Sequence, residues 1–78
     1  MLTNNQKRVI KEMFKRADTL KHINIMIDNL YRDHGNSEKI KYMMRRKSVI
    51  AASIVLLGWD YNINSGILRR LNKYSQYK

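Results

Sequence analysis

The chain contains no cysteine and no proline, and only three of its 78 residues are glycine. Without cysteine, neither disulfides nor thiolate metal sites can support the fold. Without proline, and with so little glycine, few positions interrupt a helix, so long helices are the expected secondary structure. A chain of this length is expected to form a single helical domain over residues 1–78, which buries only about 60% of its unfolded surface.

Acidic residues and long apolar runs are also scarce. Six Asp and Glu stand against 16 Lys and Arg, which gives a formal net charge of +10. Such an excess attracts polyanions: nucleic acid, anionic lipid or an acidic protein surface. The one nearly continuous apolar run, residues 49–59, is far shorter than the roughly 20 residues of a membrane-spanning helix. Since the N-terminus also lacks a signal peptide, we expect a cytoplasmic protein without a membrane span.

Apolar residues recur at alternating spacings of three and four from residue 9 to residue 31. This periodicity predicts a first helix at about residues 4–33 with one apolar stripe. Thr3 or Asn4 can cap its start, and Gly35 is expected to supply the left-handed conformation that ends it. A helix this long needs an equally long partner, so we predict a homodimer through it. Asn24, at the edge of the stripe, either fixes the register of a partner helix or contacts water.

A second helix is predicted at about residues 38–57, antiparallel to the first, with Ser37 as its cap and Gly58 as its stop. Its first half is strongly basic. Its second half is apolar nearly all round, which is typical of a buried helix. We therefore expect the other segments to cover this half, and Trp59 to fold back on Ile54.

A short third helix is predicted at about residues 65–75, after a turn in which Asn64 can act as the cap. It is expected to lie across the end of the first two helices. The predicted fold class is therefore all-α, a three-helix domain with a long N-terminal helix.

Residues suited to catalysis or metal binding are few. His22 and His34 lack the partners at helical spacing that would complete a metal site, so they are interpreted as surface histidines. The sequence contains no glycine-rich phosphate loop, and a chain this small has little room for a deep pocket. We expect a non-enzymatic binding protein that uses no cofactor and no metal.

Nucleic acid, with DNA favoured, is the leading expected partner, which suits a small regulator. Cations would contact phosphates, and Asn62 and Asn64 would contact base edges. The predicted nucleic-acid-binding residues are Lys39, Lys41, Arg45, Arg46, Lys47, Asn62, Asn64, Arg69, Arg70 and Lys73.

The C-terminal half has the outline of a helix-turn-helix, with Gly58 in the turn, residues 50–57 as the first helix and residues 61–70 as the reading helix. Two residues oppose this interpretation. Ile54 is large where the helix crossing favours a small residue, and Asn64 stands where an apolar contact is expected. The alternative is a plain helical hairpin with a basic surface.

A protein-binding adaptor or inhibitor that docks on an acidic face of a larger complex is the second hypothesis. Tyrosine and arginine are typical interface anchors, and the tyrosines expected at the surface are Tyr42, Tyr61, Tyr74 and Tyr77. An anionic membrane surface is a weaker alternative. The basic and apolar residues of the second helix are separated along its length, whereas a lipid-bound helix separates them across its faces.

Overall fold

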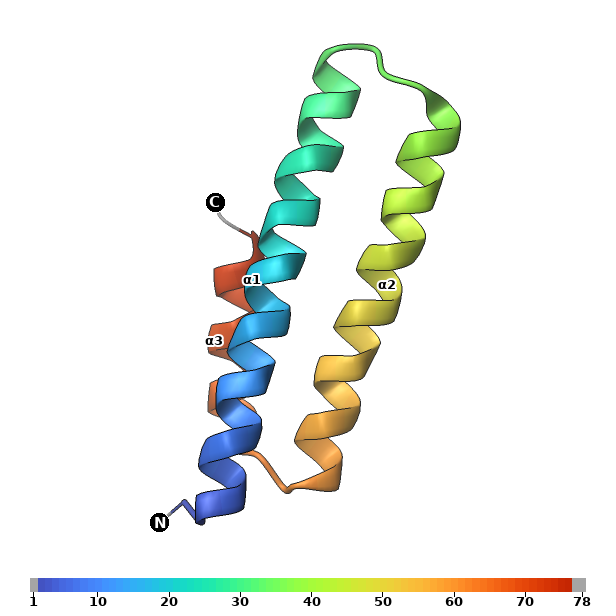
Figure 1. Ribbon diagram of the computed structural model, residues 1–78. Coiled ribbons are helices and arrows are strands. Elements are labelled where there is room, and N and C mark those ends of the chain that lie inside the picture. Colours follow the sequence, from blue (N-terminus) through green and yellow to red (C-terminus); the bar gives the residue numbers. More distant parts are fainter. Residues whose placement is uncertain (1, 77–78) are drawn as a thin grey trace.

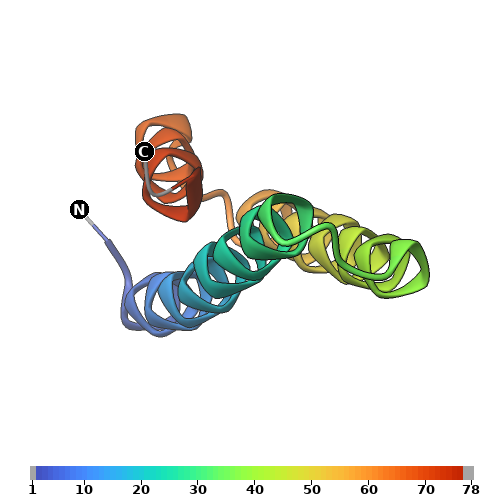
Figure 2. The same cartoon turned by 90° about the horizontal axis from the view of Figure 1, so that it is seen from above.

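The computed structural model describes residues 2–76, which form three α-helices and no strand. The helices are α1 (Asn4–Arg32), α2 (Ser37–Asp60) and α3 (Ser65–Gln76). α1 and α2 form an antiparallel hairpin, and α3 runs back beside the N-terminal part of α1, in the same direction as α1 (Figure 1). The predicted all-α, three-helix class is confirmed. The predicted position of the third helix, across the end of the other two, is wrong (Figures 1 and 2).

Side chains just before each long helix satisfy its free backbone N–H groups. Thr3 Oγ1 accepts a hydrogen bond from the Gln6 N–H at 3.1 Å, and Gln6 Oε1 accepts one from the Thr3 N–H at 3.0 Å. This reciprocal pair is a capping box, so Thr3 is the cap of α1. Asn36 caps α2, because its Oδ1 accepts from the Glu38 N–H at 2.8 Å. The prediction of Ser37 as the cap is wrong, since Ser37 is already helical.

α1 ends in a loop that closes on the last helical turn. The His34 N–H donates to the Tyr31 carbonyl at 3.4 Å, and the Gly35 N–H donates to the Leu30 carbonyl at 2.6 Å. This pair of bonds defines a Schellman motif. The left-handed residue is His34, with φ 54°, so the prediction that Gly35 supplies this conformation is wrong. Gly35 packs closely on the end of α1, because a Cβ there would lie 3.0 Å from the Leu30 carbonyl oxygen and 2.8 Å from Leu30 Cδ2.

α2 ends in the same way, with Asn62 at φ 53°. The Asn62 N–H donates to the Trp59 carbonyl at 3.3 Å, and the Ile63 N–H donates to the Gly58 carbonyl at 2.8 Å. Asparagine tolerates the left-handed region better than most residues. α2 therefore continues to Asp60, and the prediction that it stops at Gly58 is wrong.

Gly58 is a buried residue inside α2, at the point where α2 approaches α3. A Cβ built on Gly58 would lie 3.0 Å from Leu68 Cδ2. Its missing side chain thus lets α3 lie close to the end of α2.

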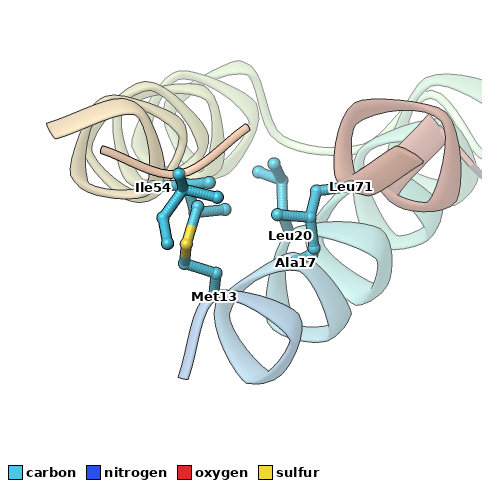
Figure 3. Close-up of a cluster of buried hydrophobic side chains, with 6 residues drawn as sticks. Met13, Ala17, Leu20, Ile54 and Leu71 are labelled. Carbon is cyan, nitrogen blue, oxygen red and sulfur yellow. The ribbon is translucent and has the colours of Figure 1, made fainter. Parts of the chain in front are cut away.

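The apolar stripe of α1 faces both other helices and is buried by them. The main cluster joins side chains from all three helices and from the turn after α2 (Figure 3): Met13, Ala17, Leu20, Ile54, Ile63 and Leu71. A second cluster, nearer the α1–α2 turn, contains Ile23, Ile27 and Met43. Burying a side chain of this size stabilises the fold by about 1.5–3 kcal/mol. The other two helices thus cover the stripe of α1 through which a homodimer was predicted, and the dimer itself stays a prediction.

Asn24 ties α1 to α3. Its Nδ2 donates to the Ser75 carbonyl oxygen at 2.7 Å, and the contact is partly buried. The interpretation of Asn24 as a residue that only contacts water is therefore wrong. It does fix a helix against α1, but that helix is α3 of the same chain.

α2 is buried on one side only. Met43, Ile54 and Gly58 are buried, whereas Val49 is 68% exposed and Trp59 is 70% exposed. The predictions that the second half of α2 is covered and that Trp59 folds back on Ile54 are both wrong. The physical reason is the position of α3, which packs mainly on α1 and leaves one face of α2 uncovered.

Candidate nucleic-acid interface

The residues predicted to bind nucleic acid are all exposed. The structure divides them among the first half of α2, the turn between α2 and α3, and the outer face of α3. The first half of α2 lies toward the α1–α2 turn, and α3 lies beside the opposite end of the hairpin (Figure 1). The predicted residues therefore do not form one cluster.

We call the cations of the first half of α2 the α2 basic collar, which comprises Lys39, Lys41, Arg45, Arg46 and Lys47. Successive residues of a helix point about 100° apart. Arg45, Arg46 and Lys47 therefore project in different directions. The α2 basic collar surrounds the helix, so its members cannot all contact a single row of phosphates.

The turn between α2 and α3 does not form part of a reading helix. The predicted reading helix at residues 61–70 is wrong, because α3 begins only at Ser65. Asn64 Oδ1 accepts from the Gly66 N–H at 2.6 Å, so this side chain is already engaged in capping α3. α3 also runs opposite to α2 (Figure 1), whereas helix-turn-helix motifs cross at about 90–120°. The alternative of a plain helical hairpin fits this geometry.

α3 is a short amphipathic helix with a purely cationic outer face. Ile67 and Leu71 pack inward, whereas Arg69, Arg70 and Lys73 are exposed. No acidic residue occurs in α3. The charged residues of its outer face are therefore all cations, and they lie between residues 69 and 73.

Tyr74 connects α3 to the outer side of α1. Its hydroxyl donates to Asp18 Oδ1 at 2.7 Å. Its ring centre lies 6.4 Å from that of Phe14 in an edge-to-face arrangement, and Lys21 Nζ lies 4.7 Å from the ring centre. Such cation–π contacts are worth about 0.5–1 kcal/mol at exposed sites. Tyr74 thus covers one stripe of α1.

That stripe continues to Lys7 and Lys11, because positions 7, 11, 14, 18 and 21 alternate at spacings of four and three. Arg70 precedes Tyr74 by one helical turn and lies on the same face of α3. Since α3 runs in the same direction as α1 (Figure 1), the helical spacing places Arg70 on the Tyr74 side of α3, and Tyr74 lies against the stripe of α1 that carries these lysines. We call this surface the α1–α3 basic face: Lys7, Lys11, Lys21, Arg70 and Lys73.

Sequence reasoning missed the α1 half of this face. Lys7 and Lys11 are not among the residues that the sequence predicted to bind nucleic acid. Their spacing of four shows that they share a side of the helix, but only the contacts of Tyr74 show that this side adjoins α3.

Asp18 is the acidic residue within this stripe, and two neighbours engage it. The hydrogen bond to Asp18 raises the pKa of the Tyr74 phenol above its ordinary value, as do partial desolvation and the Asp18 charge. Tyr74 therefore stays a neutral donor at neutral pH. His22 Nδ1 lies 3.9 Å from Asp18 Oδ2.

The ion pairs between arginine and carboxylate among residues 2–76 both join neighbours within α1: Arg16–Glu12 at 3.3 Å and Arg32–Asp28 at 3.7 Å. Exposed pairs of this kind contribute little to stability. Across the same residues, the cations of α2 and α3 form no ion pair. Their charge is available to an external anion.

Other kinds of site are not seen in the described part of the chain. Residues 2–76 contain no group of three or more His, Asp or Glu side chains placed to hold a metal ion. None of the three helices in this range is long and apolar enough to cross a membrane. Tyr77, one of the predicted surface tyrosines, lies outside the described residues.

Comparison of the chain with protein-family models, curated proteins and solved structures finds no match.

Proposed function

We propose that the protein is a non-enzymatic nucleic-acid-binding protein, with DNA as the favoured partner, and that the α1–α3 basic face binds phosphates. The observation that supports this function is that Tyr74 joins the basic helix α3 to a lysine-bearing stripe of α1, where Lys21 lies over its ring, with no ion pair on the described α3 cations. The net charge of +10 adds a long-range attraction for a polyanion.

The same geometry favours phosphate contact over base reading. Asn64 caps α3 with its side chain, and the members of the α1–α3 basic face are Lys and Arg side chains. Binding through Lys and Arg to phosphates carries little sequence information. We therefore expect weak sequence preference. We also expect the affinity to fall steeply as the salt concentration rises, because binding releases counterions from the DNA.

Titration of a labelled mixed-sequence DNA duplex, followed by fluorescence anisotropy at two salt concentrations, tests this function. The pair Lys11→Gln and Arg70→Gln should weaken binding at least tenfold. It should also make the affinity less dependent on salt. The slope of log affinity against log salt concentration should fall by about 0.9 for each phosphate that the variant no longer neutralises. The pair Lys39→Gln and Lys41→Gln removes the same charge from the α2 basic collar and should have a smaller effect.

Two results would contradict the proposal. Absence of binding at low salt would remove the nucleic-acid function. Equal weakening by the two matched variant pairs would show that net charge, and not the α1–α3 basic face, determines binding. Competition with an RNA duplex in the same assay distinguishes DNA from RNA.

The second candidate function is a protein-binding module that docks on an acidic surface. The supporting observation is the exposure of apolar side chains on α2 next to Arg45 and Arg46, since exposed apolar patches mark interaction sites. If the protein fails to bind nucleic acid at low salt, loss of partner capture on changing Tyr42→Ala would support this alternative.

A further inference from the structure

The exposed face of α2 carries a second apolar stripe, distinct from the one that packs on α1. Its members follow spacings of three and four in strict alternation, and all are exposed: Tyr42, Arg45, Val49, Ala52, Leu56 and Trp59. Leu56 is 55% exposed and Trp59 is 70% exposed. A repeat of this kind over nearly three heptads is the pattern of a coiled-coil seam. Within residues 2–76, nothing covers it.

We propose that this stripe is the seam of an antiparallel homodimer, in which α2 packs against α2 of a second copy. The stripe is its own complement when one copy is reversed. In an antiparallel pair, residues that face each other have numbers with a constant sum. With a sum of 101, position 42 faces 59, position 45 faces 56 and position 49 faces 52, so each stripe residue faces another stripe residue. A self-complementary patch of this kind is what a two-fold symmetric interface requires.

The side chains in this register complement one another. Tyr42 faces Trp59 of the second copy, which pairs two aromatic rings. Small Ala52 faces branched Val49, and the aliphatic stem of Arg45 faces Leu56. The surface of α2 is hollowed where Tyr42, Arg45, Arg46, Val49 and Ile50 line a groove. That groove lies opposite Ala52 and Leu56 of the second copy and can receive them as knobs.

Charge selects the antiparallel direction. The α2 basic collar occupies the first half of α2, whereas residues 48–60 contain no Lys or Arg and one acidic residue, Asp60. In an antiparallel pair, each collar lies against the uncharged half of the other copy. A parallel pair would place the two collars side by side, and like charges at that separation repel.

The chain's size also favours a second copy as the occupant. A domain of this length has a small core, and burial against a second copy adds to it. The α1–α3 basic face lies on other helices, so the proposed dimer leaves it free to bind nucleic acid. The dimer does not depend on the proposed nucleic-acid function, because it forms from protein alone.

Sedimentation equilibrium of the full chain over a range of protein and salt concentrations measures this association. We expect a monomer–dimer equilibrium that strengthens as salt screens the net charge. Leu56→Lys places a cation opposite Arg45 of the second copy and should weaken dimerisation at least tenfold. Met26→Lys adds the same charge at an exposed apolar residue of α1 and should leave dimerisation nearly unchanged.

A charge-swap variant tests the direction of the pair. Combining Arg45→Glu with Leu56→Lys should restore much of the dimer, because the new carboxylate then faces the new ammonium of the other copy. A spin label at Asp60→Cys provides a distance, since position 60 faces position 41. The two labels of an antiparallel dimer should lie about 28 Å apart along the helix axis.

Circular dichroism of each variant confirms that the helices persist, since all the changed residues are exposed. A chain that remains monomeric at all concentrations and salts would overturn the proposal. So would a dimer that Met26→Lys weakens as much as Leu56→Lys does, or labels close enough to indicate parallel helices. Capture of an acidic protein by a chain that stays monomeric would assign the stripe to a different partner and would also overturn it.

Discussion

Tyr74 is the residue at which α3 and the outer side of α1 meet. Its hydroxyl, ring edge and ring face are each engaged, by Asp18, Phe14 and Lys21 respectively. A single side chain therefore holds α3 in register and lies among the cations of the α1–α3 basic face. Its raised pKa follows from the hydrogen bond it donates to a carboxylate.

This hydrogen bond predicts the titration of the tyrosines. The absorbance of phenolate should show a component, that of Tyr74, which ionises above the ordinary tyrosine pKa of about 10. Tyr74→Phe should remove this late component, and Asp18→Asn should move it to lower pH. Because the pKa is raised in the folded state, the bond stabilises the fold below the ordinary pKa of tyrosine. That stabilisation is lost as the pH rises through the raised pKa.

The corresponding stability measurement is urea unfolding at neutral pH, where Tyr74→Phe should be less stable than the unmodified chain. Tyr31→Phe serves as the matched control, because among residues 2–76 the Tyr31 hydroxyl makes a weak contact with the Met44 sulfur at 3.9 Å. The assignment would be contradicted by an unmodified chain without a component that ionises above the ordinary tyrosine pKa, or by a component that Tyr74→Phe leaves in place.

At the scale of the helix, the two Schellman loops explain where α1 and α2 end. Each places a residue other than glycine in the left-handed region, His34 after α1 and Asn62 after α2. That conformation costs about 1–2 kcal/mol for a residue with a Cβ. The loops persist because their hydrogen bonds satisfy the last carbonyl groups of each helix.

A substitution at the end of α1 that relieves this strain should therefore stabilise the folded chain. His34→Gly should raise the free energy of unfolding by about 0.5–1 kcal/mol, because relief of the left-handed strain exceeds the added flexibility of the unfolded chain. His34→Ala keeps the strain and should not stabilise the chain. Urea unfolding followed by circular dichroism measures both. Equal effects of the two changes would show that the His34 side chain, and not its backbone, determines stability there.

The helices themselves could be predicted from the sequence because their signals are local. The apolar periodicity marks α1, and Thr3 and Asn64 are recognisable caps. The ends after α1 and α2 were assigned to glycines because glycine usually adopts positive φ. In this chain His34 and Asn62 adopt it, and the two glycines serve close packing. Local propensity does not distinguish these two uses of glycine.

The burial of α2 and the makeup of the candidate site could not be predicted in the same way. An apolar run predicts that a surface will be covered, but it does not say by which segment. The packing of α3 on α1 depends on contacts such as Asn24–Ser75 and Tyr74–Asp18, which join residues more than 50 positions apart. These contacts decide both that Trp59 is exposed and that Tyr74 lies against the stripe of α1 that carries Lys11.

At the scale of the whole molecule, the net charge connects folding, association and binding. The chain carries +10 on a body of 47 × 21 × 16 Å. Electrostatic repulsion extends about 30 Å at 0.01 M ionic strength and about 8 Å at 0.15 M. At low salt it therefore acts across the full width of the molecule. Added salt should strengthen the proposed dimer and weaken the proposed binding to nucleic acid, since the first brings like charges together and the second unlike charges.

The same repulsion acts within one chain and predicts how salt changes its stability. Thermal unfolding of dilute protein should shift to higher temperature between about 0.01 M and 0.15 M sodium chloride, because the compact state concentrates the charge. Recovery of 1 kcal/mol corresponds to a shift of about 4–8 °C for a domain of this size. Changing both Lys7→Glu and Lys11→Glu lowers the net charge by four and should reduce the salt dependence. As a control, the melting temperature is measured at two protein concentrations. If the two values are equal, dimerisation does not contribute to the salt effect. If salt lowers the melting temperature of the unmodified chain, attractive ion pairs outweigh the repulsion of its cations.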